Sequence, residues 1–106
     1  MKIFISQPMN GKTDTEIKTE RLAAIEKIEE VYGNDVEIVD SIITDAPDGA
    51  KPLWYLGKSL QMLSEADGVY FMKGYESARG CIIEWEACHG YDIPVIGIGD
   101  YLIKTK

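Results

Sequence analysis

Two glutamates stand near the start of an expected helix, where a carboxylate can do chemistry. Glu84 and Glu86 belong to the stretch ARGCIIEWEACHGYDIPVI, residues 78–96, in which a glycine turn leads into a helix and then into a short apolar strand. Near a helix N-terminus the macrodipole and the free N–H groups favour the ionised form of a carboxylate. An ionised carboxylate held in a cleft can act as a nucleophile or stabilise a developing sugar cation.

Only one of these two carboxylates can face a common site, because residues two apart lie about 200° from each other around a helix. The alternative role for Glu84 is to complement the helix dipole, which is what an acidic residue in a first turn usually does. Helix position alone favours that alternative. We expect Glu86 to be solvated or structural.

Other residue types that could carry chemistry give weaker signals. Asp67 ends a helix and opens a strand in EADGVYF, and a lone aspartate there is most often a capping or turn residue. Trp85 and Tyr70 could stack on a base, although core packing is the commoner role of each. The glycine-containing loops match neither the dinucleotide-binding nor the Walker pattern.

The sequence gives little support for a metal or disulfide site. Cys81 and Cys88 are seven residues apart in an expected helix, about 10 Å along its axis, which is beyond disulfide reach. The chain has one histidine and no C-x-x-C pair, so a structural zinc site is not expected.

Strand-like and helix-like segments alternate along the chain and must position these residues. The expected strands are residues 2–6, 36–40, 66–72 and 93–99, and the expected helices are residues 14–32, 52–66 and 81–90. On the second helix, Leu53, Leu56, Leu60 and Leu63 form the expected inner face. The alternation predicts a three-layer, Rossmann-like or flavodoxin-like α/β fold, with a mainly parallel sheet of four to five strands and helices on both faces.

In such a sheet, ligands bind outside the carboxyl ends of the strands. The loops SQPMNGK, DSIITD and MKGYESARG follow three of the expected strands, so we expect the functional site among them. The Glu84 helix begins directly after the last of these loops.

Composition sets the broad class of the protein. The 106 residues predict a single domain, residues 1–106, and 45% apolar with 27% charged residues is typical of a globular protein. No apolar run approaches the roughly 20 residues that span a bilayer, and the N-terminus does not resemble a signal peptide, so we expect a cytoplasmic protein without membrane partners. The net charge of −7 argues against nucleic acid as a partner. A small anion can still bind at a helix N-terminus.

The motifs IFISQPM, LSEADGVYFM and RGCIIEWEACHGYDIPVI, in this order, resemble the nucleoside 2-deoxyribosyltransferase family. That family includes relatives that hydrolyse deoxynucleoside 5′-monophosphates. Gln7-Pro8 stands where the family has Gly-Pro, Asp67 matches its aspartate, and Gly80 to Glu84 match the turn and the catalytic glutamate. Pro94-Val95-Ile96 matches the closing strand. The resemblance covers nearly the whole chain, although each motif is short.

The resemblance implies cleavage or transfer at the N-glycosidic bond of a 2′-deoxynucleoside or its 5′-monophosphate. Glu84 would attack the anomeric carbon, and Asp67 would position the sugar or help to protonate the departing base. The resemblance implies neither a metal nor an organic cofactor, and it implies a homo-oligomer, a dimer or larger. It leaves open the base preference, and whether water or a second base is the acceptor.

Two loops supply the expected substrate-binding residues. Ser6, Gln7, Pro8 and Met9 come from the first loop, and Ser77, Arg79 and Gly80 come from the turn before the Glu84 helix. The start of that helix can donate N–H groups, and Ser77 or Arg79 a side chain, to a 5′-hydroxyl or phosphate. Arg79 in particular favours a phosphorylated ligand.

Three departures from the family pattern motivate an alternative function. Gln7 and Glu86 replace glycines, and Cys81 stands where a small residue is frequent. These changes around the expected site are also compatible with a non-catalytic module of the same fold that binds or senses a nucleotide. A third possibility is cleavage of the nicotinamide N-glycosidic bond of a dinucleotide, which also needs a single glutamate.

Overall fold

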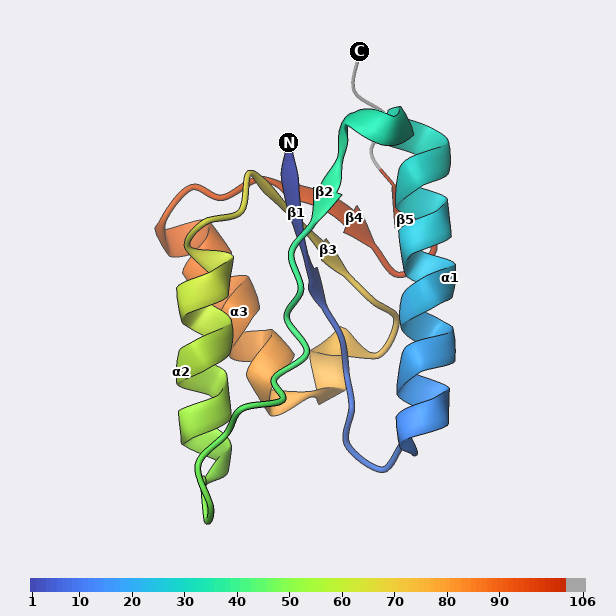
Figure 1. Cartoon of the computed structure of the whole chain (residues 1–106). Helices are drawn as coiled ribbons and strands as arrows, with labels where there is room; N and C mark the ends of the chain where they lie inside the picture. Colours follow the sequence, from blue (N-terminus) through green and yellow to red (C-terminus); the bar gives the residue numbers. More distant parts are fainter. Residues whose placement is uncertain (103–106) are drawn as a thin grey trace.

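A five-stranded sheet forms the middle layer of the protein (Figure 1). The computed structural model describes residues 1–102. Within them the sheet has the order β2-β1-β3-β4-β5, and only β5 runs antiparallel to its neighbour. The strands are β1 (Lys2–Ser6), β2 (Glu37–Ile38), β3 (Gly68–Phe71), β4 (Val95–Ile98) and β5 (Tyr101–Leu102). The predicted mainly parallel α/β sheet is confirmed.

Helices cover both faces of this sheet. Helix α1 (Asp14–Tyr32) packs on one face, and helices α2 (Pro52–Leu63) and α3 (Arg79–Gly90) pack on the other (Figure 1). Two short 3₁₀ helices, η1 (Gly33–Asp35) and η2 (Tyr75–Ser77), lie in the connections. The predicted three layers are therefore confirmed. Within the described residues, no helix has both the length and the apolar character needed to cross a bilayer.

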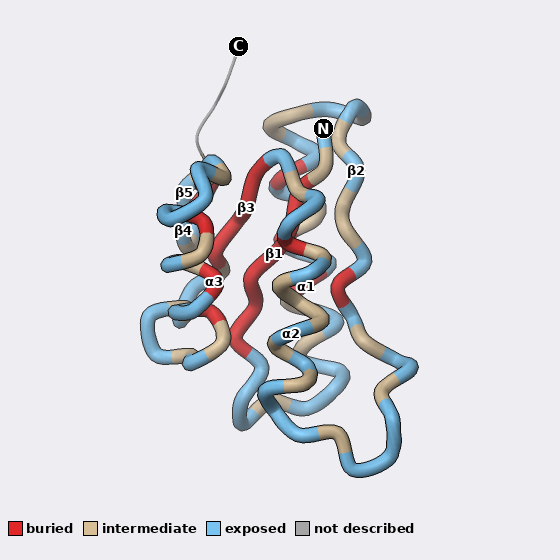
Figure 2. The backbone as a smooth tube through the Cα atoms, turned by 90° about the vertical axis from the view of Figure 1, so that its left-hand side faces the viewer, coloured by how far each residue is buried: buried red, intermediate tan, exposed pale blue. Residues whose placement is uncertain are grey.

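The strand side chains alternate between two hydrophobic cores, as the period of two requires. Ile3 and Ile5 of β1 point toward α1 and pack with Ala24 and Ile28. Phe4 points to the other face and joins a second core beneath α2 and α3. Figure 2 shows β1 and β3 buried along most of their length. Burial on both faces explains why these strands are apolar runs without a polar side.

Local signals in the sequence set the helix ends. At the start of α1, the Thr13 hydroxyl accepts from the Glu16 N–H, and the Glu16 carboxylate accepts from the Thr13 N–H, which is the predicted capping box. Pro52 occupies the first turn of α2. Gly33 ends α1 with a φ of 77°, which glycine adopts at low cost.

Several features differ from the expectation. Helix α3 begins at Arg79, two residues before the expected start, and β2 is shorter than expected. Leu53, expected on the inner face of α2, is 75% exposed. The first turn of α2 extends past the carboxyl ends of the strands, so the sheet does not cover this side chain (Figure 1). The sequence predicted no element after residue 99, whereas the structure has β5 there. Residues 103–106 lie outside the described part of the chain.

Candidate active site

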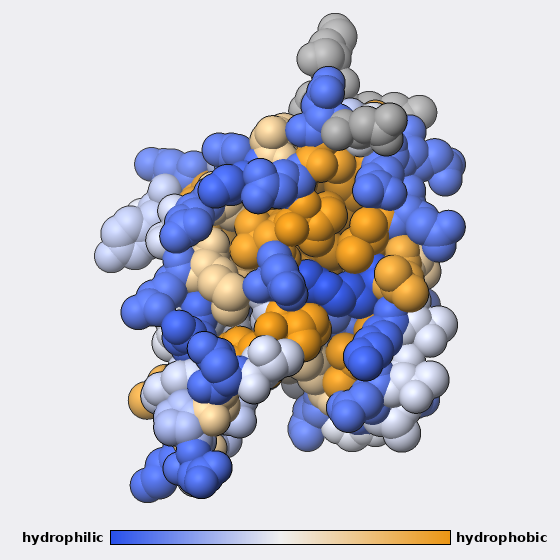
Figure 3. All heavy atoms as spheres, in the orientation of Figure 1, coloured by the Kyte–Doolittle hydropathy of each residue, from blue (hydrophilic) through white to orange (hydrophobic). Residues whose placement is uncertain are grey.

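A cleft of about 1250 Å³ opens at the carboxyl ends of β1 and β3. Strand β2 lies on one side of β1, and β3 and the later strands lie on the other side. The strand order therefore reverses at β1, and open α/β sheets bind ligands at such a switch point. The cleft is bordered by the loops after β1, β2 and β3 and by parts of α2 and α3. Figure 3 shows the molecule hollowed between the start of α2 and the loop after β1.

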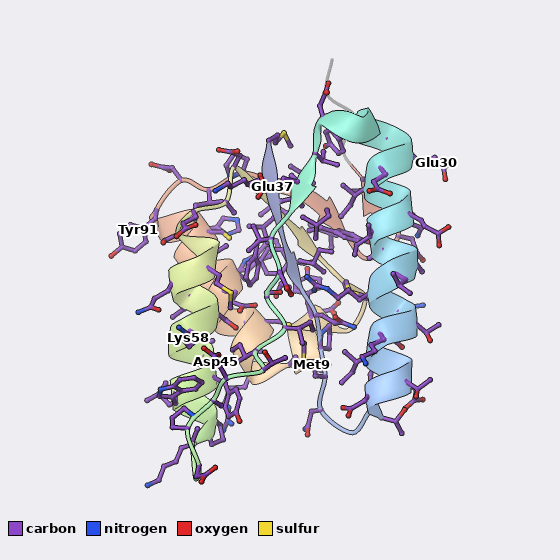
Figure 4. The ribbon with its side chains drawn as sticks, in the orientation of Figure 1. Met9, Glu30, Glu37, Asp45, Lys58 and Tyr91 are labelled. Carbon is purple, nitrogen blue, oxygen red and sulfur yellow. The ribbon has the colours of Figure 1, made fainter. Side chains whose placement is uncertain are left out.

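Figure 4 shows two of these loops from the side. Met9, from the loop after β1, and Asp45, from the loop after β2, both lie in the lower half of the molecule, Asp45 alongside α2 and Met9 between α2 and α1. Met9 borders the cleft, and so does Ser41 at the start of the second loop. Segments that are far apart in the sequence therefore meet at one site.

Glu84 borders this cleft as a buried carboxylate. Its side chain is 6% exposed, and the Ser6 hydroxyl donates a hydrogen bond of 2.6 Å to Glu84 Oε1. Ser6 is the last residue of β1, so this bond joins the sheet to α3. Burial raises the pKa of Glu84 to about 7, and the hydrogen bond from Ser6 opposes this with a smaller effect. At neutral pH the carboxyl group is therefore poised between its two protonation states.

The expected environment of Glu84 needs correction. Because α3 begins at Arg79, Glu84 lies in the second turn, away from the free N–H groups at the helix start. The dipole does not hold it ionised, and burial favours its neutral form instead. The position in the second turn also argues against the alternative role, since a carboxylate complements the dipole from the first turn. Glu86 is exposed, as predicted.

Asp67 lies at the opposite end of the sheet. It directly precedes β3, where its carboxylate accepts from the Lys2 N–H at 2.7 Å and its own N–H donates to the Lys2 carbonyl at 2.7 Å. Four residues of strand place it about 13 Å from the carboxyl end of β3. The structure thus does not bring Asp67 to Glu84, and the predicted supporting role is corrected to joining the amino ends of β1 and β3. Among the described residues that border the cleft, Glu84 is the only carboxylate.

The other predicted site residues gather around Glu84. Those that border the cleft are Gln7, Pro8, Met9, Ser77, Arg79 and Gly80. Ser6 does not border it and holds Glu84 from behind. The Gln7 amide is turned toward α1, where Nε2 donates to the Ile17 carbonyl at 2.8 Å, and its buried Oε1 has no hydrogen-bond partner. Gln7 therefore fixes the first loop against α1.

Cys81 borders the cleft one turn before Glu84, and burial raises the pKa of its thiol to about 11. The thiolate is the nucleophilic form of cysteine, and the raised pKa keeps Cys81 in its thiol form at neutral pH. The described residues also contain no group of three His, Cys, Asp or Glu side chains that could hold a metal ion. Glu84 is thus the candidate nucleophile of the cleft.

Three lysines of the cleft, Lys12, Lys51 and Lys73, were missed at the sequence level. With Arg79, four of the 11 basic residues border the cleft, against one of the 18 acidic residues, so the cleft is basic in an acidic protein. Lys12 pairs with Glu20 at 2.7 Å. Within the described residues no ion pair engages Lys73 or Arg79, which leaves both available to an anion. The position of Lys73 directly after a strand end was the usable signal.

Tyr70 and Trp85 have the expected core roles. Tyr70 is buried under α1, and its hydroxyl donates to the Gly99 carbonyl. The Trp85 ring packs on Phe71 and Tyr75, with centroid distances of 5.1 and 5.3 Å. Neither Tyr70 nor Trp85 borders the large cleft. The cluster around Trp85 instead joins η2 to α3 and so supports the turn that carries Arg79.

Comparison with known proteins gives a family and no activity. A search of curated proteins and a search of solved structures each found no match. The profile of one protein family, described as a domain of unknown function, matches residues 1–97 and therefore includes the cleft, Ser6 and Glu84. Since this match spans most of the chain, the protein belongs to the DUF4406 family.

Proposed function

We propose that the protein cleaves or transfers at the N-glycosidic bond of a 2′-deoxynucleoside or its 5′-monophosphate, with Glu84 as the nucleophile. The observation that carries the proposal is a buried carboxylate, fixed by Ser6, in a large basic cleft at the switch point of the sheet. The resemblance of the motifs around Gln7-Pro8 and Glu84 to nucleoside 2-deoxyribosyltransferases supports the same reaction.

The reaction takes two displacements at the anomeric carbon. Ser6 occupies Oε1 of Glu84, which leaves Oε2 to attack. In the first step the C1′–O bond to Glu84 forms, the C1′–N bond breaks, and its electron pair leaves with the base. In the second step water or another base attacks C1′ and releases Glu84. A fixed carboxylate beside C1′ stabilises the positive charge that develops there.

The protonation state of Glu84 sets the pH dependence of this reaction. Only the ionised form attacks, and with a pKa of about 7 its population rises through neutral pH. No second carboxylate borders the cleft within the described residues, so no carboxylic acid beside Glu84 is present there to protonate the departing base.

The basic side chains favour the phosphorylated substrate. Lys73 and Arg79 flank the η2 turn and have no ion-pair partner within the described residues. A 5′-phosphate lies a few bonds from the anomeric carbon, so a phosphate held at this turn places C1′ within the same cleft as Glu84. The resemblance also favours a homo-oligomer, which sedimentation velocity tests.

The test compares the protein with Glu84→Gln and with Glu86→Gln, a matched control two residues along the same helix and exposed. Each is incubated with deoxynucleosides and their 5′-monophosphates, with and without a second free base, and products are separated by chromatography. We expect base release or exchange by the native protein and by Glu86→Gln, and its loss in Glu84→Gln. A need for the second base identifies a transferase.

Two results contradict the enzyme. Turnover that persists in Glu84→Gln removes Glu84 as nucleophile. Nucleotide binding without any turnover by the native protein supports the alternative of a non-catalytic binding or sensing module.

A further inference from the structure

One aromatic side chain in the cleft is accessible to a ligand. Within the described residues only Phe4 and Tyr55 are aromatic and border the cleft. Phe4 is 2% exposed and belongs to the core beneath α2 and α3. Tyr55, near the start of α2, is 40% exposed. A flat ligand group that enters the cleft therefore meets the ring of Tyr55.

Apolar side chains extend the surface around Tyr55. Leu53 and Leu56 of α2 and Ile83 of α3 also border the cleft, and Leu53 and Ile83 are exposed. A Cβ added at Gly80 would lie 3.8 Å from Leu56 Cδ1, so α2 approaches the start of α3 closely here. We call Leu53, Tyr55, Leu56 and Ile83 the apolar wall. Its contact with water is unfavourable, and an apolar ligand group that covers it gains affinity.

The Tyr55 ring is oriented by its neighbour. The Trp54 ring stands nearly perpendicular to it, with an interplanar angle of 86° and a centroid distance of 5.3 Å. An edge contact of this kind is a favourable arrangement of two aromatic rings and stabilises this orientation of Tyr55.

The remainder of the cleft has the opposite character. Lys73 and Arg79 border it from the connection between β3 and α3, and Lys51 precedes the apolar wall at the N-cap of α2. Glu84 lies in α3, the helix that begins with Arg79 and also contributes Ile83 to the apolar wall. A nucleotide combines the same two characters, with an anionic phosphate and a base whose flat faces are apolar.

We infer that Tyr55, with Leu53 and Leu56, forms the surface on which the base of the substrate stacks, while the phosphate lies at Lys73 and Arg79. The inference rests on the proposed function and adds a residue that determines affinity for the base. Every base has a flat face, so stacking on Tyr55 accepts several bases.

The test measures equilibrium binding and needs no turnover. Calorimetric titrations in the Glu84→Gln background use two probes, deoxyadenosine 5′-monophosphate and 2-deoxyribose 5-phosphate, which lacks the base. We expect Tyr55→Ala to weaken binding of the nucleotide roughly 5-fold to 100-fold and to leave binding of the sugar phosphate unchanged. Tyr55→Phe keeps the ring and the affinity.

Tyr91→Ala is the matched control, because Tyr91 is 82% exposed and points away from the molecule after the end of α3 (Figure 4). It should change neither affinity. An equal loss for both probes in Tyr55→Ala, no loss for either, or no binding of the nucleotide at all would each overturn the inference. An altered sedimentation coefficient with unchanged nucleotide affinity would also overturn it, because the apolar wall would then contact another protein chain.

Failure of the proposed function gives a different result. If the native protein binds the nucleotide through Tyr55 and releases no base from it, the stacking surface stands and the reaction fails. If base release depends on Glu84 and Tyr55→Ala leaves nucleotide affinity unchanged, the reaction stands and the stacking surface fails.

Discussion

Protonation of Glu84 couples the candidate site to the stability of the fold. Its ordinary pKa is 4.5 and its pKa in the folded protein is about 7. Between these pH values the unfolded chain has released the proton and the folded protein retains it, so stability falls as the pH rises. Above about pH 7 both states are ionised and the loss is complete. The shift in pKa corresponds to a decrease in the free energy of unfolding on the order of 3 kcal/mol over this pH range.

We therefore expect Glu84→Gln, which cannot ionise, to gain stability relative to the native protein as the pH rises. The difference in unfolding free energy should grow by on the order of 3 kcal/mol between about pH 4.5 and pH 8, measured by urea denaturation. Glu86→Gln, at an exposed position of the same helix, is the control. A difference for Glu84→Gln that does not change with pH would show that the carboxylate is not desolvated.

The residues of the site were predictable to different degrees. Glu84 was identified through a resemblance, since its helix position alone favoured a dipole role. Asp67 was misassigned although the sequence held the correction, because a residue that precedes a strand lies at the amino end of a parallel sheet. Tyr55 was missed because periodicity shows which face of a helix is apolar, and it does not show how far the helix extends past the sheet.

Two glycines test how tightly the elements are packed. A Cβ at Gly97 in β4 would lie 2.7 Å from Tyr70 Cδ1 and 2.8 Å from the Tyr101 carbonyl oxygen, so the antiparallel β5 leaves no room for it. We expect Gly97→Ala to lower the free energy of unfolding by about 1 to 3 kcal/mol.

At Gly57 in α2 nothing lies within 4 Å of an added Cβ. Gly57→Ala should instead stabilise the protein by about 0.5 to 1 kcal/mol, through helix propensity.

Urea denaturation of both variants measures this difference in sign. The same substitution is made twice, so the contrast isolates the packing of each element. Equal effects at the two positions would contradict the close approach of β5 to β4.

At the scale of elements, strong local signals set the boundaries that were predicted best. The bounds of β1 and α1 agree with the sequence, because an apolar β-branched run and a capping box define them. The start of α3 was placed two residues late, since Ala78 at its N-cap has no capping side chain to mark the boundary. β5 has two residues and depends on pairing with β4, which is a contact that no local pattern announces.

At the scale of the whole molecule, the alternation of elements predicted the layers, and the strand order places the cleft. The loops that border it are separated by tens of residues, and their lysines become a cluster only when β1 and β3 pair. Sequence spacing cannot reveal this, because each lysine alone is an ordinary solvated residue. Net charge was equally uninformative, since a chain with a net charge of −7 still has a basic cleft.

The contrast between the acidic protein as a whole and its basic cleft predicts how salt affects ligand binding. Surface charges of the acidic protein repel a nucleotide monophosphate, whereas Lys73 and Arg79 attract its phosphate at short range. Salt screens both effects, and the short-range attraction dominates for a bound ligand. In the Glu84→Gln background, the affinity for deoxyadenosine 5′-monophosphate should therefore fall as NaCl rises from about 20 to 300 mM, and that for uncharged deoxyadenosine should not.

Substitutions locate the cations responsible. Lys73→Gln and Arg79→Gln should each weaken nucleotide binding and flatten its salt dependence, whereas Lys18→Gln, at an exposed position of α1 outside the cleft, should change neither. If Lys18→Gln acted as strongly as Lys73→Gln, the attraction would belong to the protein as a whole. A net charge of −7 makes that result hard to reconcile with binding of an anion, so a local effect at Lys73 and Arg79 is the outcome that the structure supports.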